Sequence, residues 1–173
     1  DTSNLCGALE FSECVSKSGT QPIIGTQINF KYENEIGLLT LIAKNDSGYS
    51  RIIELSSKSY LDRSELETSN CKFDDLFLDT ENVFVMSGTI NGLFGKLFNK
   101  GKLNDIEKLY KSISKKFKNN FYIEIQRHND ANEKSFENFN LQLSGKYEIP
   151  IIASQEVYYL EKSMHEAHEA LIC

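Results

Sequence analysis

The chain has 173 residues, of which 40% are hydrophobic and 25% charged, and its formal net charge is −6. This is enough apolar material for one globular domain with its own core. The acidic balance disfavours a domain whose main task is to grip the phosphate backbone of nucleic acid. No apolar run is long enough to cross a membrane and no stretch resembles a signal peptide. We therefore expect a cytoplasmic protein without membrane contact.

Helix and strand patterns alternate along the chain. Apolar residues at three- and four-residue spacing predict helices over residues 4–17, 49–60, 93–99, 103–117 and 133–144. Apolar runs rich in β-branched and aromatic residues predict strands over 22–30, 38–43, 82–88, 121–128 and 149–154. The polar region 62–80 is expected to be a surface connection with one helical turn near 73–77. The repeated order of strand and helix predicts a parallel α/β fold, either open or closed into a barrel.

The strand at residues 121–128 is the most informative segment. Its alternation places Tyr122, Glu124 and Gln126 on one face, and His128 follows at its carboxyl end. Ligands of α/β proteins gather outside the carboxyl ends of strands, so His128 stands where a metal ligand or an acid/base group would stand. A lone histidine is more often a loop residue without a chemical task, so the rest of the chain has to support this interpretation.

Polar residues from several segments are expected to meet at one edge of a parallel sheet. Asp1, Gln27, His128 and Glu156, with Tyr158 close by, would converge there. One histidine and two carboxylates can hold a divalent ion such as Mn²⁺ or Zn²⁺, whose bound water becomes a nucleophile near neutral pH. Asp1, His128 and Glu156 are therefore the candidate metal ligands, although the set is small. In the alternative, these strand ends are only solvated loops.

Other patterns point to structure rather than chemistry. His165 and His168 are three residues apart, which does not match the helical zinc-protease motif, so packing of His168 is favoured over metal binding. The glycines 88, 92 and 95 lack the lysine and hydroxyl residue of a phosphate loop. No nucleophilic triad is apparent, and no residue is assigned a catalytic role. The four cysteines, at positions 6, 14, 71 and 173, are expected to be buried thiols.

Five stretches together resemble a known family, namely residues 1–7, 22–25, 39–49, 122–128 and 151–168. They begin with Asp-Thr-Ser-Asn-Leu-Cys-Gly and include Tyr-Ile-Glu-Ile-Gln-Arg-His. In order, and over essentially the whole chain, they are similar to the PHP domain (polymerase and histidinol phosphatase) of bacterial replicative DNA polymerase III alpha subunits. No single motif is decisive, but the ordered set is specific.

This resemblance implies a (β/α)₇ barrel, incomplete here because its first strand is missing. Residues 1–173 would be a PHP domain fragment truncated at both ends, without the polymerase palm, fingers and thumb. The parent would be a DNA-directed DNA polymerase, a nucleotidyltransferase that uses Mg²⁺ in its palm, while this fragment would be non-catalytic. The implied partners are a proofreading exonuclease subunit, other replicase subunits, and DNA through the polymerase domains.

The resemblance also implies that the metal site is degenerate. Metal-binding members hydrolyse phosphoesters with histidines, aspartates and a glutamate that hold several ions. Here Asp1, His128 and Glu156 match or replace such ligands, whereas Thr2, Gln27, Leu38 and Tyr158 stand where other ligands are expected. Loss of these ligands leaves at most one residual divalent ion, Mn²⁺ or Zn²⁺. We therefore expect a structural scaffold that docks the exonuclease; the alternative is a metal-dependent phosphoesterase of the PHP superfamily.

Overall fold

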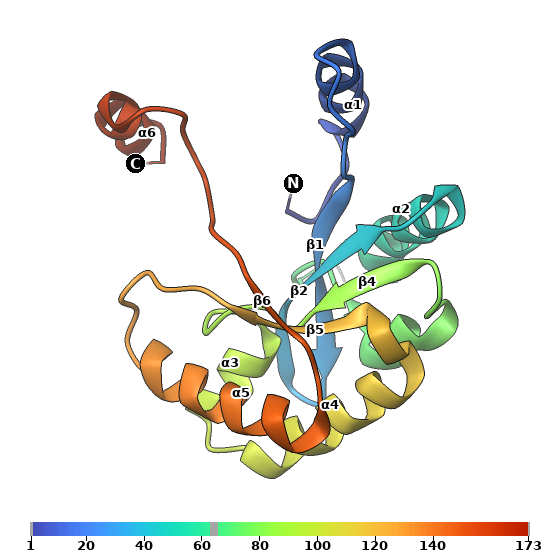
Figure 1. Cartoon of the computed structure of the whole chain (residues 1–173), viewed down its shortest axis with the longest axis vertical. Coiled ribbons are helices and arrows are strands. Elements are labelled where there is room, and N and C mark those ends of the chain that lie inside the picture. The colour runs from blue at the N-terminus through green and yellow to red at the C-terminus, as the bar shows by residue number, and fades with distance from the viewer. Residues whose placement is uncertain (1, 63–65, 173) are drawn as a thin grey trace.

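The chain folds around one open six-stranded sheet with helices packed against it (Figure 1). The structure is a computed structural model, and it describes residues 2–62 and 66–172. The strand order is β3-β1-β2-β4-β5-β6. The strands are β1 (Gly25–Tyr32), β2 (Glu35–Ala43), β3 (Cys71–Lys72), β4 (Val83–Met86), β5 (Phe121–Ile125) and β6 (Ile151–Ala153). Among the described residues β3 and β6 form the two edges and do not pair, so the sheet is open and the barrel that the resemblance implies is not observed.

The expectation of an all-parallel sheet is wrong at the second strand. β2 runs antiparallel to both β1 and β4, whereas β1 pairs in parallel with β3, β4 with β5, and β5 with β6. The cause is a tight hairpin in which Tyr32 pairs with Glu35 across the residues Glu33 and Asn34. Glu33 adopts φ +53° there, as a two-residue hairpin turn requires. The sheet is therefore mixed.

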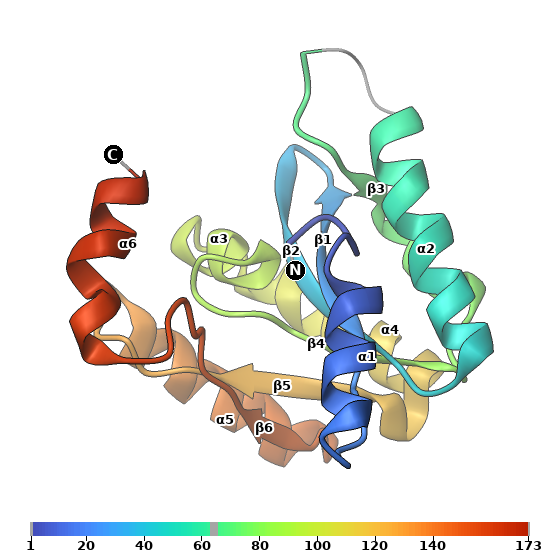
Figure 2. The same cartoon turned by 90° about the horizontal axis from the view of Figure 1, so that it is seen from above.

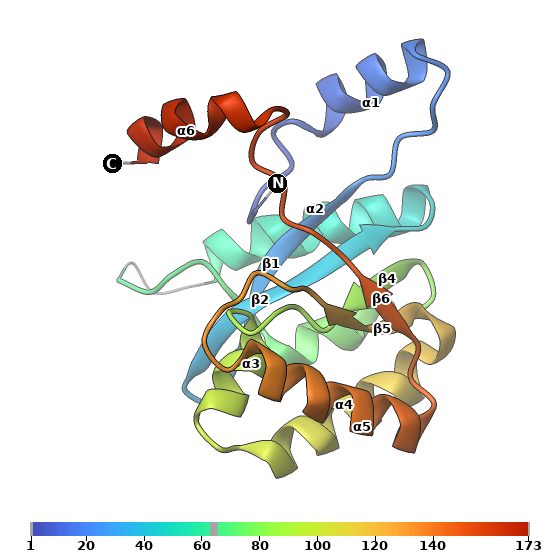
Figure 3. The ribbon, with the colours of Figure 1, turned by 60° about the vertical axis from the view of Figure 1, so that its left-hand side comes forward.

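The helices are close to their predicted positions. They are α1 (Ala8–Lys17), α2 (Asp46–Leu61), α3 (Leu93–Asn99), α4 (Leu103–Phe117), α5 (Glu133–Tyr147) and α6 (His165–Ile172), with short 3-10 turns η1 (Phe73–Leu78), η2 (Lys118–Asn120) and η3 (Lys162–Met164). Figures 1 and 3 show α3, α4 and α5 together below the sheet, and α1 and α6 projecting away from it. Figure 2, seen from above, shows α2 and α6 on opposite sides of the molecule.

The amphipathic pattern of α4 correctly predicts its buried side. Ile106, Tyr110 and Ile113 are fully buried against the sheet, and the lysines of the opposite side are exposed. Aromatic rings continue this core, since the Tyr110 ring lies 4.7 Å from that of Phe94 and 5.5 Å from that of Phe121. Together with the aliphatic side chains of β1, β2 and α2, these residues form one core cluster. This burial is the main source of stability.

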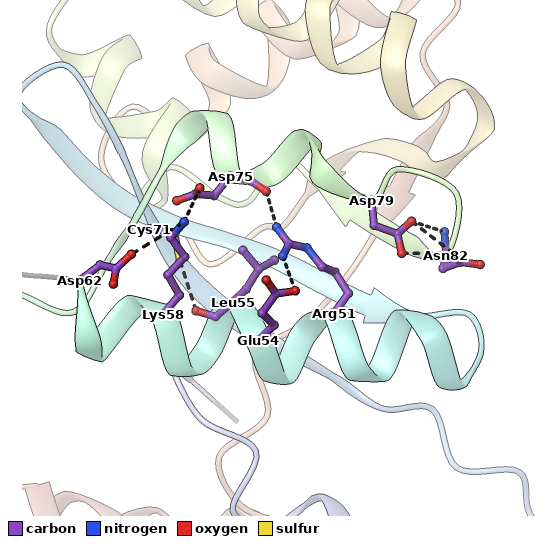
Figure 4. A network of polar contacts seen from close by, with 9 residues as sticks. All are labelled: Arg51, Glu54, Leu55, Lys58, Asp62, Cys71, Asp75, Asp79 and Asn82. Atoms are coloured by element: carbon purple, nitrogen blue, oxygen red, sulfur yellow. Dashed lines mark hydrogen bonds and ion pairs between the residues drawn. The ribbon is translucent and has the colours of Figure 1, made fainter.

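The region 62–80 was expected to be a surface connection with one helical turn near 73–77. The turn is observed as η1, but residues 70–76 are not a surface connection. Asn70, Cys71, Phe73 and Leu76 are buried, because β3 pairs with β1 and η1 packs beside α2. Figure 4 shows the polar contacts that attach this segment to α2, here called the Arg51 cluster: Arg51, Glu54, Lys58, Asp75, Asp79 and Asn82.

In the Arg51 cluster, side chains of α2 form hydrogen bonds with Asp75 in η1, the segment that follows β3. The Arg51 Nη2 donates to the Asp75 carbonyl oxygen at 2.6 Å, and the Lys58 Nζ contacts the Asp75 carboxylate at 2.8 Å. The Cys71 thiol donates to the Leu55 carbonyl oxygen at 3.2 Å. Burial raises the pKa of that thiol to about 11. The segment is therefore fixed by contacts distant in sequence.

Several predictions fail near the chain's ends. The apolar run 149–154 suggests a buried strand, but Ile151 is 42% exposed on this edge strand. The apolar spacing over 4–17 suggests that Leu9 and Phe11 of α1 pack inward, but they are 81% and 50% exposed. Cys6 and Cys14 are exposed rather than buried, and Cys71 is buried; these three are free thiols, while Cys173 lies outside the described residues. Within the described chain, no helix is long and apolar enough to span a membrane.

Candidate functional site

A cavity of about 70 Å³ lies at the carboxyl ends of β4, β5 and β6. Gly88, with φ +77°, turns the chain after β4 and lines this cavity beside Thr89 and Asn91. The other lining residues come from β1, β2 and the segments after β4, β5 and β6: Gln27, Leu38, Thr40, Gly92, Gln126, His128, Asp130, Glu133 and Glu156. We call this the strand-end cavity. Its place agrees with the rule for ligand sites in α/β sheets.

The strand-end cavity brings together three of the positions that the sequence singled out. Gln27, His128 and Glu156 line it, although they are far apart in the chain. Asp1, the third candidate metal ligand, lies outside the described residues. Tyr158 donates from its hydroxyl to Glu156 Oε2 at 2.8 Å. This hydrogen bond is the main cause that raises the pKa of Tyr158.

Two further carboxylates line the cavity that sequence reasoning missed. Asp130 and Glu133 follow His128 in the loop and first turn of α5. Both carry protein hydrogen bonds: Glu133 accepts from the backbone N–H groups of His128 and Asn129 at 2.9 Å, and Asp130 accepts from Asn91 at 2.9 Å. The sequence did contain a signal for them, because the two acidic residues lie two and five positions after a histidine at the end of a strand.

At the positions where the resemblance expects metal ligands, Thr2 and Gln27 form a hydrogen bond with each other and Leu38 is aliphatic. The Thr2 hydroxyl donates to the Gln27 side-chain oxygen at 3.3 Å, and Thr2 forms an isolated parallel bridge with Gln27. Leu38, which stands in place of a histidine, contributes an aliphatic wall to the cavity. An amide, a hydroxyl and an isobutyl group are poor ligands for a transition metal.

The described residues of the cavity do not form a metal centre by themselves. Among residues 2–62 and 66–172, which leave out the candidate ligand Asp1, no group of three or more His, Cys, Asp and Glu side chains is placed to hold a metal ion. The carboxylates of Asp130, Glu133 and Glu156 each accept hydrogen bonds from protein donors. These donors compete with a cation for part of the lone pairs of the carboxylates.

Directly behind the cavity lies a buried carboxylate that the sequence did not mark as functional. Glu124, on β5, is 4% exposed, and its neighbour Gln126 lines the cavity. The charged residue at the centre of an otherwise apolar strand was the signal for it. Its contacts are developed below.

The histidine pair on α6 packs against tyrosines, as expected for His168. The His168 ring lies 5.3 Å from that of Tyr158 and 5.7 Å from that of Tyr159, and the His165 ring lies 5.8 Å from that of Tyr159. Tyr158 therefore connects α6 with Glu156 at the cavity.

Comparison with known proteins identifies the family. Residues 1–128 match the family model described as the PHP domain. The chain is 32% identical to the DNA polymerase III subunit alpha of Rickettsia bellii and 30% identical to that of Caulobacter vibrioides, with the whole chain aligned in both cases. It is 33% identical to that of Vibrio cholerae, with 98% of the chain aligned. The chain spans about 15% of the length of these curated relatives, or 16% for the Caulobacter protein. On the family match, which covers well over half of its residues, the chain belongs to the PHP domain family.

Proposed function

We propose that this chain is the N-terminal PHP domain of a bacterial replicative DNA polymerase of the III alpha type. In this role it has no catalytic residue of its own, stabilises the polymerase, and docks a separate proofreading exonuclease subunit during DNA replication. Polymerisation, with its Mg²⁺ ions and DNA contacts, would belong to palm, fingers and thumb regions outside these 173 residues. The relatives named above, all DNA polymerase III alpha subunits, support the assignment to a replicase.

The observation that carries the scaffold role is the hydrogen bonding of the cavity carboxylates. A hydrolytic site needs carboxylates and imidazoles free to bind ions that activate water. Asp130, Glu133 and Glu156 accept instead from Asn91, from backbone N–H groups and from Tyr158. A site whose carboxylates accept hydrogen bonds from the protein itself suits a domain that maintains shape and presents surfaces.

Exonuclease docking can be tested by titrating this chain with the proofreading exonuclease subunit encoded in the same genome. Calorimetry should detect a stoichiometric complex at micromolar concentrations, which a docking platform requires. A carboxyl-to-amide change at a buried position, such as Glu124→Gln, should leave binding unchanged because docking uses the outer surface. Absence of a complex, both with this chain and with the complete polymerase, would contradict the docking role.

A second candidate function is a metal-dependent phosphoesterase with Asp1, His128 and Glu156 as ligands. It is favoured by one observation, which is that His128 and Glu156 line the same cavity. It predicts one or more bound Mn²⁺ or Zn²⁺ ions per chain and activity without any polymerase domain. Hydrolysis of a phosphoester by the purified chain with added Mn²⁺ separates the two functions, since one retained ion is compatible with both.

A further inference from the structure

Glu124 is an ionisable side chain within the core of the sheet. It is 4% exposed, and it lies between the fully buried Ile123 and the partly buried Ile125. The free space beside it, between β5 and α5, measures about 10 Å³ and is also lined by Asn140 and Phe136. A volume of about one water molecule leaves the carboxylate little room to change its rotamer. Glu124 is therefore held in one place.

The Glu124 carboxylate joins two neighbouring strands at their carboxyl ends. Its Oε1 accepts from the Ser154 hydroxyl, directly after β6, and from the Gln126 amide nitrogen at 3.4 Å. The same amide nitrogen donates to the Ser154 Oγ at 2.8 Å. Glu124, Gln126 and Ser154 thus form a closed three-membered set, here called the Glu124 triad. The backbone N–H of Glu124 also donates to Ser87 Oγ at 2.9 Å, which adds the end of β4.

The Glu124 carboxyl group fixes which way the Gln126 amide points. Its Oε1 accepts from the NH₂ group of Gln126, so the carbonyl oxygen of that amide lies on the opposite side. Since Gln126 also lines the strand-end cavity, this contact fixes the chemical character of that wall.

We infer that Glu124 is the positioning residue of the strand-end cavity. Through the triad it fixes the orientation of the Gln126 amide and anchors Ser154, two residues before Glu156. It thereby holds the segments after β5 and β6, which carry His128 and Glu156, in register. Hydrogen bonds to a buried carboxylate perform here the cross-linking that a shared metal ion performs in a metal centre. This inference concerns how the cavity is built, and it holds whether or not the domain docks an exonuclease.

The isosteric change Glu124→Gln tests the role of the carboxyl group. Because glutamine can both donate and accept, the variant keeps the shape but no longer dictates the orientation of Gln126. In nuclear magnetic resonance spectra, the Gln126 side-chain NH₂ should lose its exchange protection and show a second set of signals. Native-state exchange of the Ser154 amide proton, which is bonded to the Ile125 carbonyl oxygen, should become about tenfold faster.

The variant Ser154→Ala removes the hydroxyl that bonds to both Glu124 and Gln126. It tests whether the three residues of the triad act as one set. The exchange rate of the backbone amide proton at position 154 should rise by a similar factor. In the double variant, this rate should be close to that of either single variant, because both changes break the same set of hydrogen bonds. Glu148→Gln, at an exposed glutamate that follows α5, is the matched control and should change neither readout. If Glu124→Gln does not fold, Ser154→Ala alone must release the Gln126 amide.

Two results would overturn the inference. One is a Gln126 side-chain amide that keeps a single, protected set of signals in Glu124→Gln or in Ser154→Ala. The other is strictly additive exchange effects in the double variant, which would mean that Glu124 and Ser154 act separately. Neither result bears on exonuclease binding, which is measured by the titration described above.

Discussion

The Arg51 cluster and the Glu124 triad are two polar clusters within one domain, and they differ in how they meet solvent. Arg51 is buried, but its partner Glu54 and the nearby Asp62 and Lys58 reach the surface, where water completes their hydrogen bonding. Glu124 is 4% exposed and is surrounded by core. Among the described residues, each cluster has one buried polar atom without a hydrogen-bond partner, namely Arg51 Nε and Glu124 Oε2. The first cluster attaches a loop to a helix, whereas the second lies behind the candidate site.

The difference that remains is the exposure of the partners. A buried polar atom without a partner costs stability in both clusters. Only the Arg51 cluster has partners that water can solvate. A charge at the protein surface is solvated and can be exchanged at little cost. We therefore regard the Arg51 cluster as a stabilising device and the Glu124 triad as a device that sets the geometry of the strand-end cavity.

The largest stability effect is expected at Arg51. Arg51→Ala leaves the Asp75 carbonyl oxygen without its donor and removes a buried aliphatic stem, so the free energy of unfolding should fall by about 3 kcal/mol. The control is Arg127→Ala, because Arg127 is 77% exposed in its pair with Glu137 and should cost less than about 1 kcal/mol. Urea denaturation measures both. Equal losses would show that the Arg51 cluster is no more stabilising than a surface ion pair.

A smaller effect is expected at Tyr110, which lies on the side of the Glu124 triad. Its fully buried hydroxyl donates to Asn140 Oδ1 at 3.1 Å, and burial raises the pKa of that hydroxyl. Tyr110→Phe leaves the Asn140 oxygen unpaired and should cost about 1–2 kcal/mol. The matched change Tyr60→Phe, at an exposed tyrosine bonded to the Ser3 carbonyl oxygen, should be nearly neutral. A neutral Tyr110→Phe would mean that Asn140 has another donor.

The N-terminus of α2 provides a third test, on the side of the Arg51 cluster. The Asn45 side chain accepts from the Gly48 backbone N–H at 3.0 Å, as predicted for a helix cap. Asn45→Ala should lower the free energy of unfolding by about 1 kcal/mol, whereas Asn45→Asp should retain most of it. Thermal denaturation of both variants would refute the capping role if alanine and aspartate were equally destabilising.

The smallest effect concerns an exposed contact outside both clusters, on α4. Hydrogen bonds from Lys146 and Tyr147 hold the pKa of Glu107 below its ordinary value of 4.5. Its folded-state pKa is lowered, so its contribution is present above pH 4.5 and is lost as the pH falls through the folded-state value. The difference in Tm between wild type and Glu107→Gln should therefore shrink between pH 6 and the acid limit of about pH 3. A difference that does not change with pH would contradict this.

The sequence predicts local elements well where one periodicity dominates. The ranges 93–99 and 103–117 agree with α3 and α4 at both ends, because the apolar spacing and the breaks around Gly101 are unambiguous. The hairpin between β1 and β2 was missed because Glu33-Asn34 lacks the glycine that usually marks such turns. The burial of residues 70–76 was missed because it depends on pairing with β1, forty residues earlier in the chain.

The candidate site was likewise predicted in part and missed in part. The rule for strand ends, together with the family resemblance, brought Gln27, His128 and Glu156 to one cavity. It did not reveal that Asp130, Glu133 and Glu156 accept hydrogen bonds from their neighbours, because a pattern of residue types does not contain donor geometry. Nor did it reveal the Glu124 triad, whose members belong to β5 and to the end of β6, 28 residues apart between Gln126 and Ser154.

The most direct test of the scaffold role is a phosphoesterase assay of this chain with added Mn²⁺, with His128→Ala in parallel. The assay should use an activated phosphomonoester and a phosphodiester, with stoichiometric metal content measured on the same samples. Our account predicts no turnover above the metal-only background and no difference between wild type and His128→Ala. Metal-dependent hydrolysis that His128→Ala abolishes would show that the strand-end cavity is an active site.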